Sequence, residues 1–235
     1  DRPRVECDDD RTGHAVEARL YAEDPEKDFL PSTGKLFALQ LPEGEGIRVD
    51  AGVEEGGEVT PFYDPMIAKI IARGASRDQA LDRLAAALGR TVVAGPKTNV
   101  AFLKKLCEAE GFRMGPFDTG FIDRNRDALG ASPQPLDLAA AAAGTLYLLE
   151  QQSREQRGAR SASRDPWAQA DGFSLSPRPP VGVVALAEGE RVVVPIVADA
   201  AGLRVVPGFA ADSDAVVVIA DAGVIVVNAG RQTAV

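Results

Sequence analysis

Hydrophobic and polar residues alternate near the start of the chain. Within residues 13–22, Ala15, Glu17, Arg19 and Tyr21 fall on one side, and the intervening residues, which are mainly apolar, fall on the other. A period of two predicts a strand with one buried face. Further short strands punctuated by Gly and Pro are predicted over residues 35–42, 46–53 and 65–74.

The period changes to that of a helix after residue 75. Leucines recur at helical spacing over residues 76–90, and Ser76 with Gln79 forms a capping-box signal at the start. A second helix is predicted over residues 98–112, with Gly111 as its C-cap. Short strands followed by helices predict an α+β domain built on an antiparallel sheet.

The second half of the chain has a different pattern. A Pro-rich stretch at residues 130–137 precedes one long Ala- and Leu-rich helix, and Val-rich strands follow from about residue 182. This order fits a small barrel or a curved sheet wrapped on a helix. We therefore predict two domains: residues 1–128, an α+β lobe, and residues 129–235, a long helix followed by a small all-β barrel-like domain.

Composition narrows the range of partners. The chain has 235 residues, of which 45% are hydrophobic, and its formal net charge is -9. That content suffices for real cores. A broad nucleic-acid surface would require clustered Lys and Arg, so nucleic acid is not an expected partner. No apolar run reaches the roughly 20 residues that cross a membrane, so membrane insertion is not expected either.

The cysteines and the single histidine favour no metal site. Cys7 and Cys107 lie far apart and form no CxxC pair, which indicates free thiols in a reducing compartment. His14 has no second histidine or cysteine at a metal-ligand spacing, so we expect it to pack or to hydrogen-bond. The charged opening, "DRPRVECDDDRTG", has neither Met nor a signal peptide and suggests a piece of a longer protein.

Glu17 and Arg19 are predicted to share one face of the first strand. Taken alone, the pair fits an ordinary ion pair on a solvated sheet. Its surroundings change that interpretation. The stretches "GHAVEARLYAEDP", "FLPSTGKL", "FYDPMIAKIIARG" and "GPKTNVAFL" follow one another in the first half of the chain.

In this order and spacing, over about residues 11–125, these motifs resemble the C-terminal lobe of the biotin carboxylase component of biotin-dependent carboxylases. The remaining helix and strands resemble, more weakly, the linking domain of long acyl-CoA carboxylase α-chains. The best phrase of that second match is "DPWAQADGF". The resemblance therefore implies part of an α-chain rather than a stand-alone biotin carboxylase subunit.

The resemblance assigns roles to several residues. Arg19 aligns with the family's catalytic arginine, which would hold the anionic biotin oxygen or bicarbonate, and Glu17 would orient it. A fixed guanidinium stabilises charge as it develops, and arginine stays protonated. Tyr63 and Asp64 match positions that line the biotin pocket. Arg48 matches an arginine at a homodimer contact, where Glu45 replaces a nearby family aromatic.

The family's remaining machinery is not found in this sequence. We find neither the Gly-rich ATP-grasp loop, nor "RxQVEH", nor the "AMKM" sequence that carries biotin. Biotin, ATP and Mg²⁺ are therefore expected cofactors of the full-length protein and not of this chain alone. The isolated chain is expected to be inactive as a ligase.

Two functions remain open. The first is a fragment of an acyl-CoA carboxylase α-chain, with methylcrotonyl-CoA or propionyl-CoA carboxylase favoured over acetyl-CoA, pyruvate or urea carboxylase. The second is a non-catalytic scaffold for dimerisation and β-subunit binding. The expected partners are a carboxyltransferase β-subunit, a biotin carrier domain and a second biotin carboxylase lobe. A cytoplasmic location is favoured, or the mitochondrial matrix in a eukaryote.

Overall fold

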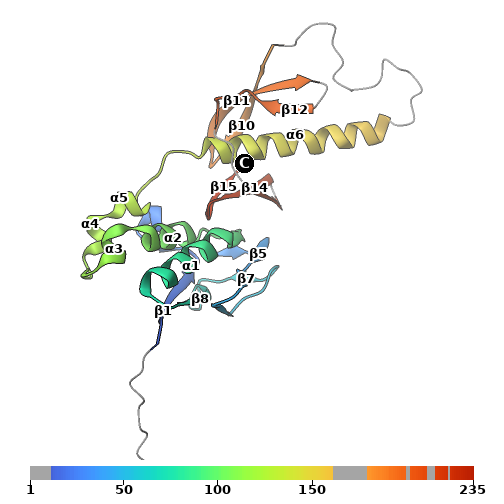
Figure 1. Ribbon diagram of the computed structural model, residues 1–235. Helices are drawn as coiled ribbons and strands as arrows, with labels where there is room; N and C mark the ends of the chain where they lie inside the picture. The colour runs from blue at the N-terminus through green and yellow to red at the C-terminus, as the bar shows by residue number, and fades with distance from the viewer. Residues whose placement is uncertain (1–11, 161–178, 200–201, 211–214, 222) are drawn as a thin grey trace, which may run out of the picture.

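The computed structural model describes residues 12–160, 179–199, 202–210, 215–221 and 223–235. Two features singled out in the sequence, Cys7 and the phrase "DPWAQADGF", lie outside these ranges. The described chain forms an α+β lobe, then a long helix with a small antiparallel sheet on either side of it (Figure 1).

The lobe is built on a three-stranded antiparallel sheet in the order β1-β8-β6. The predicted first strand forms as β1 (His14–Tyr21), and its neighbours are β8 (Met66–Gly74) and β6 (Ile47–Ala51). The predicted alternation is confirmed, since Ala18 and Leu20 are buried while Glu17 and Arg19 are exposed. The register sets Arg19 opposite Lys69 of β8.

The strand predicted over residues 35–42 forms as two short pieces. β4 (Gly34–Lys35) pairs with β7 (Glu58–Val59), whereas β5 (Ala38–Gln40) pairs with β9 (Val92–Ala94). The chain changes partner between them, because the amide of Leu36 bonds Gly57 and that of Phe37 bonds Ala94. Leu36 is fully buried at this crossing. A further short pair consists of β2 (Glu23–Asp24) and β3 (Leu30–Pro31), joined through the 3-10 turn η1 (Pro25–Lys27).

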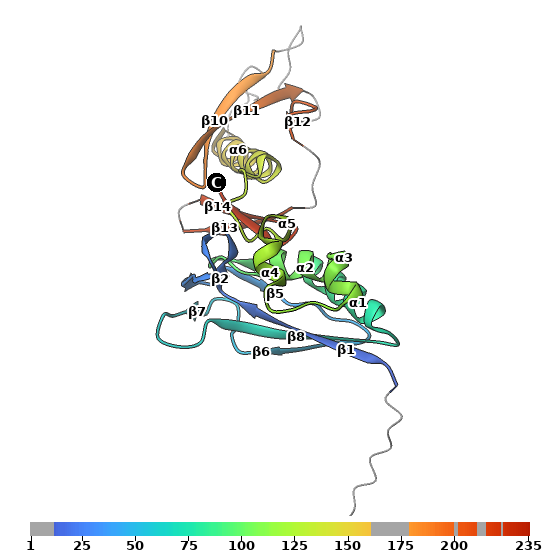
Figure 2. The same cartoon turned by 90° about the vertical axis from the view of Figure 1, so that its left-hand side faces the viewer.

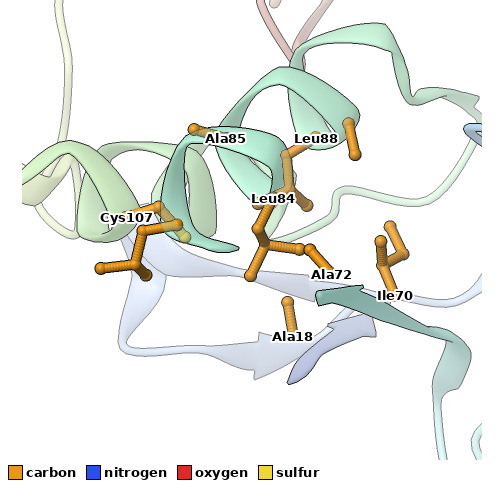
Figure 3. Close-up of a cluster of buried hydrophobic side chains, with 9 residues drawn as sticks. Ala18, Ile70, Ala72, Leu84, Ala85, Leu88 and Cys107 are labelled. Carbon is orange, nitrogen blue, oxygen red and sulfur yellow. The ribbon is translucent and has the colours of Figure 1, made fainter. Parts of the chain in front are cut away.

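Helix α1 (Arg77–Arg90) covers one face of the sheet (Figure 2). Its leucines pack on Ala18, Ile70 and Ala72 from the strands (Figure 3). The Ser76 hydroxyl caps the amide of Gln79 at 3.3 Å, as predicted. The return bond of the capping box is displaced by one residue, because Oε1 of the Gln79 side chain accepts from the backbone amide of Ala75 at 2.6 Å.

The second predicted helix is shorter than expected. α2 (Val100–Glu108) ends before Ala109, which is extended, and α3 (Glu110–Met114) begins anew. The prediction of Gly111 as a C-cap was therefore wrong. A Cβ on Gly111 would lie 2.9 Å from the Phe121 ring, so glycine is required there for close packing. α4 (Phe121–Arg124) and α5 (Arg126–Leu129) complete the lobe, and Leu129 packs with Phe102.

The long predicted helix is confirmed as α6 (Leu138–Arg160). The described strands after it pair as two separate three-stranded sheets and not as one closed barrel. The helix packs between them, with Ala141 against one sheet and Ala140 against the other. The upper sheet comprises β10 (Val181–Ala187), β11 (Glu190–Asp199) and β12 (Gly202–Val205), and the lower one β13 (Val216–Ala220), β14 (Gly223–Asn228) and β15 (Arg231–Ala234).

The small residues of α6 explain how two sheets can approach one helix. A Cβ on Gly144 would lie 2.8 Å from a methyl group of Val235, so the lower sheet comes as close as a glycine allows. The lower sheet also packs on the lobe, since Val227 contacts the buried Val92 and Ala94 of β9. The sheet β13–β15 is thus a shared layer between α6 and the lobe (Figures 1 and 2).

Cys107 gives a direct test of this packing. It is 4% exposed beneath α1, and burial raises the pKa of its thiol to about 11. At pH 8 only about a thousandth of the thiol would be ionised even if reagent could reach it, and the thiolate is the reactive form. In a Cys7→Ser background we expect Cys107 to resist iodoacetamide in the native protein and to react within minutes in denaturant. Rapid native labelling would contradict the described packing.

Candidate functional site

The face of the central sheet opposite α1 is charged. Glu17 and Arg19 project from β1, Lys69 from β8, and Arg48 and Asp50 from β6. Register places Lys69 between Arg19 and Asp50, so two cations and one carboxylate lie side by side across the three strands. The same strands that supply the apolar core therefore supply this charged face, because successive side chains point to opposite sides.

Arg19 is held in place by a neighbouring carboxylate on its own strand. Its Nε donates to Oε1 of Glu17 at 3.1 Å, and the two side chains are 60% and 42% exposed. The hydrogen bond to Glu17, followed by that to Tyr21, raises the pKa of Arg19, so it stays cationic. A guanidinium has five N–H donors, more than its contacts with Glu17 and Tyr21 use. The group can therefore still offer donors to an oxygen of a bound molecule.

The loop that precedes β8 brings Tyr63 and Asp64 to the end of β1. Oδ1 of Asp64 accepts from the amide of Met66 at 3.2 Å, and Met66 pairs with Tyr21. Tyr63 is 85% exposed and its neighbour Phe62 is 92% exposed. Two adjacent aromatic rings in solvent are unusual, and they suit a surface that another element covers. The pocket roles of Tyr63 and Asp64 remain predictions.

Arg48 and Glu45 lie on and before the edge strand β6. Nε and Nη2 of Arg48 donate to the two carboxylate oxygens of Asp50 at 3.0 and 3.1 Å, and this pairing raises the pKa of Arg48. The Glu45 side chain is 96% exposed and lies 3.9 Å from Arg83. Both residues are accessible, and their place in a dimer contact remains a prediction.

The remaining predictions from the sequence concern His14 and metal binding. His14 is half-buried at the first position of β1, opposite Gly74. Within the described ranges, no three His, Cys, Asp or Glu side chains gather in a metal-binding arrangement. The chemistry available on the charged face is therefore that of fixed cations and carboxylates.

Sequence reasoning missed one residue of this region, Asn99. It directly precedes α2, a position typical of a helix cap, yet its side chain makes no capping bond. Instead its amide nitrogen donates to the carbonyl oxygen of Arg19 at 3.2 Å, and its oxygen accepts from the amide of Tyr21 at 3.0 Å. Only its place in the motif "GPKTNVAFL" marked it in the sequence.

Comparison with known proteins finds relatives of this chain. The chain is 40% identical over 166 residues to the mitochondrial methylcrotonoyl-CoA carboxylase subunit alpha of Dictyostelium discoideum, covering 70% of this chain and 24% of the relative. It is 46% identical over 110 residues to the biotin carboxylase of Halalkalibacterium halodurans, covering 47% of this chain and 24% of the relative.

A solved structure shows the same fold. A structure of Rhizobium etli pyruvate carboxylase T882A with acetyl coenzyme A superposes with a TM-score of 0.52 and 31% identity, covering 58% of this chain and 13% of that chain. The chain thus spans about a quarter or less of each of these three proteins. Residues 17–124 match the family model described as the biotin carboxylase C-terminal domain. With the sequence relatives and the shared fold, this match places residues 17–124 in the biotin carboxylase C-terminal domain family.

Proposed function

We propose that the lobe forms one wall of a site where biotin is carboxylated, with Arg19 as its catalytic residue. The observation that carries the proposal is the position of Arg19. Its guanidinium is held by Glu17 on the sheet face opposite α1, and the Arg19 side chain remains 60% exposed. A cation that is organised and still accessible can stabilise charge on a bound molecule.

The carboxylation of biotin develops a negative charge that this cation could stabilise. The urea nitrogen of biotin is a poor nucleophile, and removing its proton places negative charge on the ureido oxygen. Arg19 would donate hydrogen bonds to that oxygen and lower the cost of the charge. Glu17 would keep the guanidinium from rotating away. ATP and Mg²⁺, which would activate bicarbonate, would bind residues beyond those of this chain.

The parent enzyme is proposed to be an acyl-CoA carboxylase, with methylcrotonyl-CoA or propionyl-CoA carboxylase as the leading candidates. The alignment with the Dictyostelium methylcrotonoyl-CoA subunit extends over 166 residues, and that with the Halalkalibacterium biotin carboxylase over 110. The longer alignment supports a long α-chain. Acetyl-CoA, pyruvate and urea carboxylases remain alternatives, because the carboxyltransferase partner selects the acyl substrate.

The second part of the chain is proposed to bind the carboxyltransferase β-subunit. Three apolar side chains lie on the outer face of the β10–β11–β12 sheet, and we call them the outer patch: Val184, Leu186 and Val193, each more than half exposed. Exposed apolar groups gathered on one face are typical of interaction surfaces. The biotin carrier domain and a second lobe are further proposed partners, the latter at Arg48 and Glu45.

The location of the protein is also a proposal. In the described part of the chain, no helix combines the length and hydropathy needed to cross a bilayer. Relatives include proteins named as mitochondrial and a bacterial biotin carboxylase. We favour the cytoplasm of a bacterium, with the mitochondrial matrix as the eukaryotic counterpart.

Replacing Arg19 tests the catalytic proposal. In the complete α-chain, Arg19→Ala should lower the kcat of free-biotin carboxylation by about 10²-fold or more, because a donor aimed at developing charge is lost. Biotin-independent, bicarbonate-dependent ATP hydrolysis should fall much less. Arg73→Ala is the matched control, since Arg73 is exposed on a neighbouring strand of the same sheet. Equal carboxylation by Arg19→Ala and the parent would remove Arg19 from this role.

Replacing the outer patch tests the partner proposal. Leu186→Asp and Val184→Asp should weaken α–β association at least tenfold, because an interface would then bury an unpaired carboxylate. Sedimentation of the mixed subunits measures the change. Met114→Asp, at an apolar residue of the lobe that is 75% exposed, is the control. Point substitutions are preferred to truncation, since removing the lower sheet would uncover Val92 and Ala94. Unchanged association would show that the outer patch is not the surface that binds the β-subunit.

A further inference from the structure

The loop of residues 95–99, with the sequence GPKTN, joins β9 to α2. It contacts the rest of the molecule in two directions. At one end Asn99 binds the strand that carries Arg19, and at the other Gly95, Pro96 and Lys97 bind the second part of the chain. None of these five residues has a role in the proposed function, so the purpose of the loop is open.

Asn99 hydrogen-bonds backbone groups on the free edge of β1. That strand lies at the edge of its sheet and pairs with β8 on one side only. Asn99 serves its other side, because its side-chain amide bonds the carbonyl oxygen of Arg19 and the amide of Tyr21, while its own backbone amide donates to Tyr21 at 3.2 Å. Asn99 thus supplies, at Arg19 and Tyr21, the hydrogen bonds that a neighbouring strand would otherwise make.

The chemistry of this contact requires a carboxamide. Asn99 is 4% exposed, and its nitrogen also donates to Oε1 of Glu23 at 2.8 Å. Asparagine offers donors and an acceptor together, whereas aspartate has no donor and would face the carboxylate of Glu23. Alanine would leave backbone groups of β1 without their partners, which is costly in a buried place. Asn99 therefore holds the backbone of β1 at Arg19 and Tyr21 from the side opposite β8.

The other end of the loop is fixed to the lower sheet through Gln232 of β15. The Gln232 side chain accepts from the amide of Gly95 at 3.0 Å and donates to the carbonyl oxygen of Pro96 at 2.6 Å. Lys97 donates to the Gln232 carbonyl at 3.1 Å and to Glu188, in the β10–β11 turn, at 3.0 Å. Gln232 is 5% exposed, so this attachment is also shielded from water.

The loop between the two attachments has little freedom. Five residues span at most about 18 Å even when fully extended. Gly95 has a φ of +136°, and a Cβ there would lie 2.1 Å from the carbonyl oxygen of Lys35. The amide of Lys97 donates to the hydroxyl of Ser32 at 2.9 Å. A displacement at Gln232 must therefore either move Asn99 or break these bonds.

We propose that Asn99 is a positioning residue for Arg19. Through the 95–99 loop, the position of the lower sheet is coupled to the position of β1, the strand that carries Arg19. The inference rests on the proposed function, since it gives Arg19 a reaction to serve. Its consequence is that the subunit-binding part of the chain and the biotin-facing strand are mechanically connected within one polypeptide.

The first experiment replaces Asn99 in the complete α-chain. Asn99→Ala should lower the kcat of free-biotin carboxylation by about tenfold to a hundredfold, because small displacements of a catalytic group are costly. Biotin-independent ATP hydrolysis and its KM for ATP should change less than twofold. Asn228→Ala is the matched control, since its amide bonds Asp137 at 2.9 Å, away from β1. A parallel fall in both activities, or no fall, would overturn the positioning role.

The second experiment tests the coupling through Gln232. Gln232→Ala should lower carboxylation by about threefold to tenfold, although the hydrogen bonds of its side chain reach only Gly95 and Pro96 and not β1. When it is combined with Asn99→Ala, the two effects should be less than additive, as expected for residues acting through one connection. Additive effects, or a lower melting temperature with unchanged carboxylation, would overturn the coupling.

Hydrogen exchange separates this inference from the proposed function. The Tyr21 amide bonds Asn99, so its protection reports the contact directly, whatever the reaction is. Gln232→Ala should speed exchange at Tyr21 in the native protein, and unchanged exchange there would overturn the coupling even if Arg19 is catalytic. This measurement also serves if Asn99→Ala fails to fold. If Arg19→Ala leaves carboxylation intact while exchange at Tyr21 responds, the proposed function fails and the coupling stands.

Discussion

The eight residues of strand β1 must place apolar side chains in the core on one face and charged side chains in solvent on the other. The rest of the lobe depends on this division. Its inward residues, such as Leu20, are sealed beneath the lobe's apolar layer, and each fully buried side chain of this size contributes about 1.5–3 kcal/mol. Its outward residues are charged, and an exposed ion pair such as Glu17–Arg19 contributes little to stability. Core packing thus fixes the strand, which leaves the charged face free to serve chemistry.

Local patterns could predict much of this arrangement. The period of two placed Glu17 and Arg19 on the exposed face, and the leucine spacing gave the helix that covers the other face. Predictions failed where a distant residue decides the geometry. Gly111 is typical of a helix end, but it lies inside α3 because Phe121 packs against it. The Val-rich strands suggested one barrel, and the small residues of α6 admit a sheet on each side instead.

The candidate site could be predicted only in part, for a related reason. A strand pattern tells which side chains share a face, but it does not tell what covers that face. In the proposed site, Arg19 and the exposed Tyr63 would line a surface to which this chain contributes one side. The family motifs, and not the periodicity, linked them to biotin. Without these motifs, the structure would suggest only an ordinary charged sheet with two solvent-facing aromatic rings on a nearby loop.

The contacts of Asn99 and Gln232 were beyond sequence reasoning because they join segments about 80 and 137 residues apart. Apolar layers such as that of Val92 and Val227 tolerate exchange among similar residues, so they fix an arrangement loosely. A buried carboxamide is less tolerant, since every unmatched group costs free energy. Among the described residues, no buried side-chain nitrogen or oxygen lacks a partner. Satisfied polar contacts at both ends of one short loop therefore specify the relative placement of the lobe and the lower sheet, which hydrophobic packing alone would leave adjustable.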